Sequence, residues 1–437
     1  MSQLNELISQ LNRCETTTQL PQIVKQLNKC ILQTLSLPAD KTSDSLLLEA
    51  FEAMTKKSIP IEVVNKYNNS NSKAISLIIF DNMRQLLIKI DSQKLSLNKE
   101  IISELLFVTI GSATENKCKL IELIVKISES QNMGHLLNEK YNNFIIKSIF
   151  NKLKTNCMKS QDFDDRNALI FQWIVSNITS IEDYIYDIFP LSMRLIDDFS
   201  IRTKIIGLKS LHVIILKGWP QLLNNGSDLL VYERLKNLLY NKETELLEVV
   251  FDCLFDVIKS ESSDRKESNK QLIAFDRNDQ ILTQLLNNIK ISSDVSYRVI
   301  HLKFIDKLAI HLNSSSIKYS KTYINVLCDL LDEPICQKSL KLFEVTINSL
   351  NTFLTIVWII VKEFSDKCLL SLLKLSVNLN ESDLSNDSKN KLNKNICQSI
   401  QLLKNSDKNS FKKLSEMLNQ SKYKQELNES ILNLFCF

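Results

Sequence analysis

Residues 243–259 read ETELLEVVFDCLFDVIK, and charged and apolar side chains alternate along them with the period of a helix. The charged side chains share one stripe, made of Glu245, Glu248, Asp252, Asp256 and Lys259. The apolar side chains fall on the opposite side and are Leu247, Val250, Phe251, Leu254 and Ile258. These offsets predict an amphipathic α-helix. Because Asp252 and Asp256 belong to a wholly charged stripe, we interpret them as part of a solvated face and not as a catalytic carboxylate pair.

The helical period continues toward the C-terminus. We expect one helix over residues 279–290 and a second that begins near Asp294 and ends near Leu312. A carboxylate at position 294 can cap the free N–H groups of a helix start. Residues 332–334, Asp-Glu-Pro, also predict a helix start, because Pro is favoured at the first helical position. From there the helical period is kept through residue 361.

The helices are therefore expected in pairs. The turns within pairs are predicted near Asp198, Asn241, Ser293 and Asp332. Their spacing is roughly 40 residues with two helices per unit, which is typical of HEAT and armadillo solenoids. In such folds each helix pair stacks on its neighbours because it cannot bury its apolar faces alone. The predicted fold is thus all-α, an α-solenoid of stacked helix pairs.

Composition supports this fold class and excludes several enzyme classes. Only 5 Gly and 6 Pro occur in 437 residues, which disfavours turn-rich β-sandwiches and barrels. No two glycines lie close enough for a dinucleotide-binding turn, a P-loop or a nucleophile elbow, all of which need closely spaced glycines. We therefore expect no site of these three kinds and no cofactor.

Histidine and cysteine give no metal or catalytic signal. The four histidines are His135, His212, His301 and His311, and they offer no pair with the four-residue helical spacing of a zinc site. The 10 cysteines are scattered without a CxxC motif, and we expect their thiols to be reduced. Cys253, Cys328 and Cys368 lie in apolar helical stretches, so we expect them to serve as small core residues. We predict no catalytic and no metal-binding residues.

Charge and hydropathy indicate neither nucleic acid nor membrane as a partner. The net charge is +4 from 54 basic and 50 acidic residues. The N-terminus lacks the basic start and apolar core of a signal peptide. The longest apolar run, residues 353–361, is about half of what a membrane crossing needs. Trp358 lies in this run, whose apolar side chains face all round the predicted helix, so we expect it to be sandwiched between repeats or covered by another protein.

Two polar segments, residues 260–270 and 380–395, are predicted to be loops between helices. The first 160 residues are helical in pattern but show a weak repeat register. We accordingly predict three parts: an N-terminal helical region over 1–160, a repeat core over 161–379, and C-terminal helices over 380–437 after a polar loop.

Residues 188–216, IFPLSMRLIDDFSIRTKIIGLKSLHVIIL, resemble a HEAT repeat. In that motif Pro190 would kink the first helix, Asp197 and Asp198 would form the turn, and Lys204 would reach back to the carboxylates. Gly207 stands where the motif has a small residue that lets the two helices pack closely. The resemblance implies that these five residues build the repeat and do not form a ligand site.

The succession of LIDDF, TKIIGLKSLHVIIL and VYERLKNLLYNKETELLEVVFDCLFDVI resembles the Tel-two-interacting protein two family over residues 160–365. This resemblance implies a non-catalytic scaffold, a subunit of the TTT co-chaperone complex in the cytoplasm and nucleus. Its implied partners are the Tel-two protein and Tel-two-interacting protein one. Indirect partners would be the heat-shock chaperone machinery and the kinases related to phosphatidylinositol 3-kinase, which serve DNA-damage signalling.

Two other classes of function stay open on the sequence alone. A HEAT or armadillo adaptor for nuclear transport or a phosphatase would share the architecture and differ in its partner. An enzyme with an unrecognised site would need convergent polar side chains in a deep pocket. In the scaffold interpretation, we expect the partner surface on the C-terminal half of the solenoid.

Overall fold

The computed structural model describes residues 26, 84, 87–88, 91, 99–110, 117–159, 165–267, 277–406, 408–420, 427 and 429–435. Within these ranges every regular element is a helix and no β-strand occurs. The chain divides into two compact units, Met1–Gly226 and Ser227–Phe437. The predicted three-part organisation, 1–160, 161–379 and 380–437, remains a prediction.

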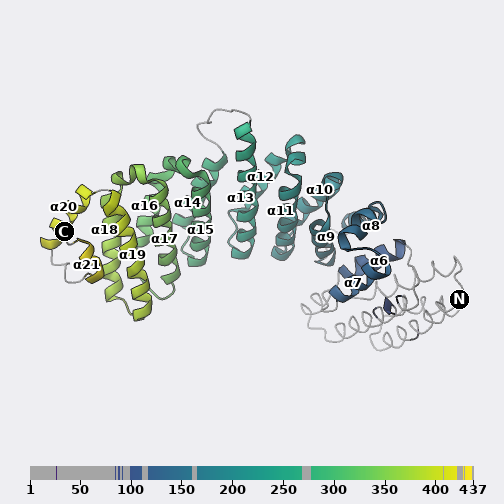
Figure 1. Cartoon of the computed structure of the whole chain (residues 1–437), viewed down its shortest axis with the longest axis horizontal. Helices are drawn as coiled ribbons and strands as arrows, with labels where there is room; N and C mark the ends of the chain where they lie inside the picture. Colours follow the sequence, from purple (N-terminus) through teal and green to yellow (C-terminus); the bar gives the residue numbers. More distant parts are fainter. Residues whose placement is uncertain are drawn as a thin grey trace. The chain divides into compact units, whose positions relative to one another are not determined.

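The first unit contains α6 (Lys99–Ile110), α7 (Lys117–Ile127), the π-helix η1 (His135–Glu139), α8 (Phe144–Lys159), α9 (Asp165–Asn177), the 3-10 helix η2 (Glu182–Tyr184), α10 (Ile185–Ile196) and α11 (Ile201–Asn224). Helix α8 packs on α9, α10 packs on α11, and α9 packs on α11 (Figure 1). The ring of Phe150 lies 6.4 Å from that of Phe171 and 5.9 Å from that of Tyr184, measured between centroids. This aromatic cluster joins α8, α9 and η2 in the core of the unit.

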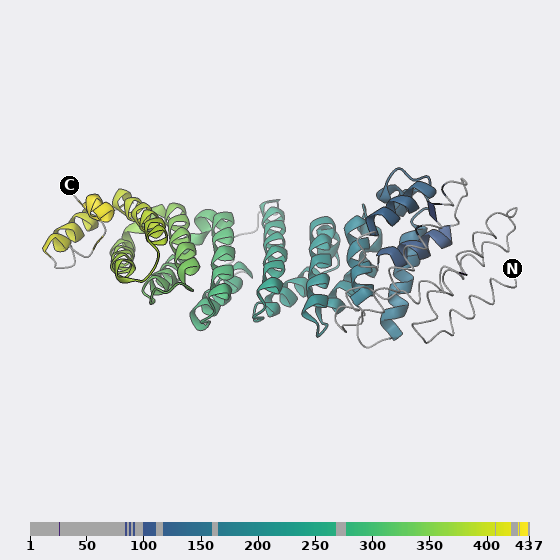
Figure 2. The same cartoon turned by 90° about the horizontal axis from the view of Figure 1, so that it is seen from below.

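The second unit contains α12 (Asp228–Leu238), α13 (Thr244–Glu267), α14 (Arg277–Ile291), α15 (Val295–Leu312), the 3-10 helix η3 (Asn313–Tyr319), α16 (Ser320–Leu331), α17 (Leu340–Ile356), the 3-10 helix η4 (Trp358–Glu363), α18 (Ser365–Glu381), α19 (Asn386–Ser406), α20 (Lys408–Gln420) and α21 (Glu429–Phe435). Consecutive helices pack in pairs, from α12 with α13 to α20 with α21. Second members of successive pairs pack on each other, α13 on α15, α15 on α17 and α17 on α19 (Figures 1 and 2). First members do the same from α14 through α20. This stacking is the predicted α-solenoid of HEAT-like helix pairs, and the fold class is confirmed.

Several local predictions in the second unit are also confirmed. Turns lie near Asn241, Ser293 and Asp332, as the sequence spacing predicts. Helices α14 and α15 cover the two predicted helical stretches, and Asp294 is the N-cap of α15, where its Oδ1 accepts a hydrogen bond from the Tyr297 N–H at 2.8 Å. The apolar stripe predicted for α13, Leu247 through Ile258, is buried. Cys253, Cys328 and Cys368 are buried free thiols.

The helix start predicted at residues 332–334 is wrong. Asp332 is instead the C-cap of α16, and α17 begins only at Leu340. Glu333 is engaged by an arginine of the preceding pair, as described below, and the Cys336 N–H donates to Ser339 Oγ at 3.0 Å. These contacts hold residues 333–339 as a longer turn, in which the capping chemistry of the Asp-Glu-Pro sequence is not used.

Of the two loops predicted from polar composition, residues 260–267 and most of 380–395 are helical, while residues 268–270 lie outside the described residues. Helix α13 runs to Glu267, and only the residues between Glu381 and Asn386 separate α18 from α19. Residues 260–270 and 380–395 contain neither Gly nor Pro. A polar stretch without these breakers can continue a helix whose sides face solvent, so the missing apolar residues did not signal an end.

Candidate protein-interaction site

The turn between α10 and α11 carries the residues of the HEAT-like motif. Asp197 is the C-cap of α10, and Asp198 Oδ1 accepts from the Ser200 N–H at 2.8 Å. Ser200 is the N-cap of α11, because its hydroxyl accepts from the Thr203 N–H at 3.4 Å. Asp198 therefore shapes the turn, and Ser200 caps α11.

The other three motif residues lie on the two helices. Pro190 is exposed inside α10, and it leaves the carbonyl of Tyr186 without its usual helical donor. Lys204 is half-buried on α11 and forms no ion pair with Asp198, although both side chains are described. Gly207 is buried on α11 against Leu195 and Ile196 of α10.

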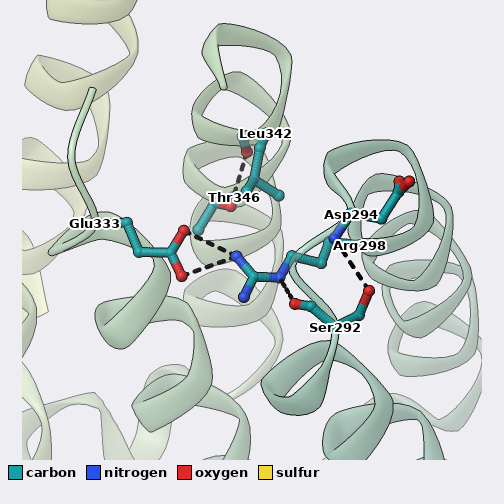
Figure 3. Close-up of polar contacts among 6 residues, drawn as sticks. All are labelled: Ser292, Asp294, Arg298, Glu333, Leu342 and Thr346. Carbon is teal, nitrogen blue, oxygen red and sulfur yellow. Dashed lines mark hydrogen bonds and ion pairs between the residues drawn. The ribbon is translucent and has the colours of Figure 1, made fainter. Parts of the chain in front are cut away.

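In the second unit, one arginine joins two successive turns. Arg298, one turn into α15, places one Nη 2.8 Å from both carboxylate oxygens of Glu333, and its Nε donates to the Ser292 carbonyl at 2.5 Å (Figure 3). Its side chain is only 12% exposed. The carbonyl lies in the α14–α15 turn and the carboxylate in the α16–α17 turn, so we call this group, Ser292, Arg298 and Glu333, the Arg298 clamp. It was not predicted from the sequence. The available signal was that Arg298 follows the N-cap Asp294 by four residues, which places both on one side of the helix start.

A second anchor fixes the α12–α13 turn to the next pair. The carbonyl of Leu239 accepts from Asn288 Nδ2 at 3.1 Å and from the Tyr297 hydroxyl at 3.3 Å. Beside it, His301 is fully buried, with one ring nitrogen 2.8 Å from the Tyr297 carbonyl. Burial lowers the pKa of the His301 imidazole to about 4, so the ring is neutral at pH 7. His301 is thus a packing residue that supports the turn.

The half-buried carboxylate of Asp306 is the strongest candidate for chemistry in the described part of the chain. Its Oδ1 accepts from the Tyr323 hydroxyl at 2.8 Å and its Oδ2 from the Ser349 hydroxyl at 2.6 Å, which joins α15, α16 and α17. Burial raises the pKa of Asp306 to about 6, against the opposing effect of the two hydrogen bonds. The adjoining cavity, lined in part by Tyr323 and Phe353, has a volume of only about 10 Å³. Because that space holds no more than a water molecule, we interpret the cluster as structural.

The raised pKa of Asp306 predicts a pH dependence of stability. Between the ordinary carboxyl pKa of 3.8 and the folded value of about 6, the folded state binds a proton that the unfolded chain does not. Stability therefore rises as the pH falls through this window. The stability difference is the free energy of unfolding of the wild type minus that of the Asp306→Asn variant. We expect this difference to increase by about 1 kcal/mol from pH 7 to pH 5. Urea titrations followed by circular dichroism measure both. A difference that does not change with pH would mean that the carboxyl keeps its ordinary pKa.

Exposed apolar side chains gather where α17 gives way to α18. The apolar run 353–361 is not one helix, because α17 ends at Ile356 and the backbone leaves helical geometry at Val357. The 3-10 helix η4 follows, with Val357 and Val361 buried and with Trp358 67% and Ile359 63% exposed. The expectation that the whole run forms one helix is therefore wrong, whereas its cover by another protein stays a prediction. The run is divided between the buried end of α17 and an exposed pair, Trp358 and Ile359. We call this exposed pair the Trp358 step.

The surface of α18 carries a second apolar feature. Leu370, Leu373 and Val377 of α18 face Leu418 of α20 and Leu427 across a groove of about 450 Å³. Lys374 is the charged residue in its lining. The groove and the Trp358 step both lie in the C-terminal half of the chain, where the sequence analysis expected a partner surface.

Among the described residues, no group of three or more His, Cys, Asp or Glu side chains is arranged to hold a metal ion. The helices that the structure describes also fall short of the length and apolarity that a bilayer crossing requires.

Comparison with known proteins gives partial likenesses. No protein-family model matches the chain. The chain is 24% identical over 182 residues to TELO2-interacting protein 2 of Rattus norvegicus, which covers 40% of this chain and 35% of that protein. It is 29% identical over 91 residues to TELO2-interacting protein 2 of Homo sapiens, covering 20% of this chain and 18% of that protein. The chain thus covers well under half of the length of these curated relatives.

Two solved structures align with most of this chain at low sequence identity. A crystal structure of importin beta aligns with 95% of this chain and 53% of that chain, at a TM-score of 0.48 and 14% identity. A crystal structure of Kap121p aligns with 99% of this chain and 44% of that chain, at a TM-score of 0.46 and 11% identity. The stacked helix pairs of the chain itself make it an α-solenoid. Part of its sequence is similar to TELO2-interacting protein 2.

Proposed function

We propose that the chain is a non-catalytic scaffold of the TELO2-interacting protein 2 kind, a subunit of a TTT co-chaperone complex in the cytoplasm and nucleus. Its direct partners are a Tel-two protein and a Tel-two-interacting protein one. Through them it supports the heat-shock chaperone machinery in maturing the kinases related to phosphatidylinositol 3-kinase. Sequence similarity to the rat and human relatives supports the choice of partners.

The Trp358 step is the observation that carries the binding function. A Trp and an Ile that are each about two-thirds exposed and adjacent on a short 3-10 helix form an apolar surface that water solvates poorly. The helix is held in place, since the Val357 N–H donates to the Phe353 carbonyl at 2.9 Å and the Ile360 N–H to the Val357 carbonyl at 3.0 Å. Trp is the residue most often found at the energetic centre of protein interfaces. The step therefore suits a protein partner.

Affinity purification of the tagged full-length chain from its own cells, followed by mass spectrometry, tests the assignment. We expect the Tel-two protein and Tel-two-interacting protein one to co-purify in comparable amounts. Recovery of transport cargo or phosphatase subunits in their place would favour the other HEAT adaptor interpretation. Recovery of neither set would remove the family assignment.

The double variant Trp358→Ala/Ile359→Ser is expected to weaken binding to the purified partner at least tenfold, because truncating a buried interface Trp costs about 2 kcal/mol or more. Surface plasmon resonance with the full chain gives the dissociation constants. The matched control is Leu229→Ser/Leu230→Ser on α12, where two adjacent leucines are 53% and 55% exposed. Equal losses from both double variants, or none from the first, would move the interface away from the Trp358 step.

A further inference from the structure

Three successive turns of the second unit carry exposed apolar side chains along one edge of the stack. Tyr240, in the α12–α13 turn, is 69% exposed, and Ile291, at the end of α14, is 84% exposed. Pro334, in the α16–α17 turn, is also exposed. We call this edge, with its lysines described below, the turn ridge.

The turn ridge is held in place by polar contacts between neighbouring turns. The carbonyl of Leu239, next to Tyr240, accepts from Asn288 and Tyr297 of the following pair. The Arg298 clamp then ties the α14–α15 turn to the α16–α17 turn (Figure 3). A surface that is already ordered loses little conformational freedom when a partner binds.

The charges of the turn ridge are unbalanced. Its exposed lysines form no ion pair with any residue that the structure describes, and they are Lys242, Lys290, Lys338 and Lys341. The nearby carboxylates are engaged: Asp294 caps α15, Glu333 binds Arg298, and Asp332 lies 3.5 Å from Lys374. Glu243 and Glu245, both near Lys242 at the start of α13, are also exposed acidic residues. The ridge thus presents apolar side chains between lysines whose charge is not neutralised.

We propose that the turn ridge is a second docking surface, which binds an acidic segment of a partner protein that also carries apolar side chains. Its carboxylates would lie against the lysines, and its apolar side chains would cover Tyr240 and Ile291. A second copy of this chain is disfavoured, since two like-charged ridges repel. Nucleic acid is disfavoured because the ridge has no free arginine, because Tyr240 is its single exposed aromatic ring, and because the whole chain carries only +4.

This proposal goes beyond the scaffold function because it adds a separate site. The ridge lies at the start of α17 and the Trp358 step at its end. Helix α17 has 17 residues, which at 1.5 Å per residue separates the two surfaces by about 25 Å. Both can therefore be occupied at once, and loss of one is expected to leave the other intact.

Fluorescence anisotropy with the full-length chain tests the turn ridge directly. The probes are labelled synthetic peptides of equal length: one alternates Glu or Asp with Leu and Phe, one replaces the apolar residues with Ser, and one replaces the acids with Lys. A single-stranded DNA oligonucleotide is the fourth probe. We expect the acidic-apolar peptide to bind at least tenfold more tightly than the other three, with an affinity that falls as salt is added.

Variants then locate the binding. The triple variant Lys242→Glu/Lys290→Glu/Lys338→Glu is expected to weaken binding of the acidic-apolar peptide at least tenfold. The double variant Tyr240→Ser/Ile291→Ser is expected to weaken this binding at least fivefold. The control Lys303→Glu/Lys321→Glu/Lys394→Glu makes the same charge change on exposed helix faces and is expected to change binding less than twofold. The proposal is overturned if the serine peptide or the oligonucleotide binds as well, or if the control triple variant loses as much. It is also overturned if the ridge variants abolish self-association of the chain, since the ridge would then be an interface between copies.

Discussion

Gly207→Ala is expected to lower the free energy of unfolding of the first unit by about 2 kcal/mol. A Cβ atom added at Gly207 would lie 2.7 Å from Leu195 Cβ, 2.9 Å from the Ile196 backbone nitrogen and 3.0 Å from the Leu195 carbonyl carbon. Two of these atoms belong to the backbone of α10, so α10 and α11 must move apart to admit the methyl group. Overpacking of this kind costs up to about 3 kcal/mol, whereas the helix preference of Ala over Gly returns up to about 1 kcal/mol. The steric cost therefore exceeds the gain in helix propensity, and the net effect is destabilising.

Gly218→Ala is the comparison variant, because Gly218 is also buried, at the kink of α11 where the backbone leaves helical geometry. Its added Cβ would meet two side-chain methyl groups, Ile181 Cγ2 at 2.9 Å and Ile185 Cδ1 at 3.0 Å. Side-chain ends can shift at small cost, so we expect Gly218→Ala to destabilise the unit less than Gly207→Ala. Urea unfolding followed by circular dichroism compares the two variants. A Gly207→Ala protein as stable as the wild type would show that α10 and α11 are not packed closely at this point.

The periodicity of the sequence was sufficient for the fold class and for the positions of the turns. In α13 the apolar and charged stripes separate cleanly, and a helix with one buried side needs little more to be recognised. Asp294 could be identified as a cap because capping depends on residues within one turn of the chain. These are local properties, and local properties can be read from one sequence.

Features that depend on contacts between helix pairs could not be predicted in the same way. Glu333 looked like part of a helix start, but its carboxylate binds Arg298, which lies 35 residues earlier in the chain. Asp306 lies among charged neighbours in the sequence, yet hydrogen bonds from α16 and α17 reach it in the fold. The Trp358 step was only partly foreseen, because the sequence does not show that the backbone leaves the helix at Val357. The turn ridge depends on which lysines lack a carboxylate neighbour, and that depends on the tertiary structure.

Arg298→Ala is expected to lower the free energy of unfolding of the second unit by about 2 kcal/mol. The variant loses the contacts of the guanidinium with both oxygens of Glu333 and with the Ser292 carbonyl. Hydrogen bonds to charged groups contribute about 1.5 to 3 kcal/mol each where they are buried. The Glu333 side chain is 38% exposed, so water partly replaces the lost partner, and the total is smaller than a fully buried pair would give.

Two further variants distinguish the clamp from a general loss of charge. Arg298→Lys keeps the charge but cannot reach the carboxylate and the carbonyl with a planar fork, so we expect it to recover no more than half of the loss. Lys374→Ala removes the more exposed pair with Asp332, whose N···O distance is 3.5 Å, and should cost less than about 1 kcal/mol. A double-mutant cycle of Arg298→Ala with Glu333→Ala gives the coupling free energy, which should exceed about 1 kcal/mol. A coupling near zero would mean that the two turns stay together without the clamp, and the Leu239 anchor and the apolar packing of α15 on α17 would then be the contacts that hold the turn ridge.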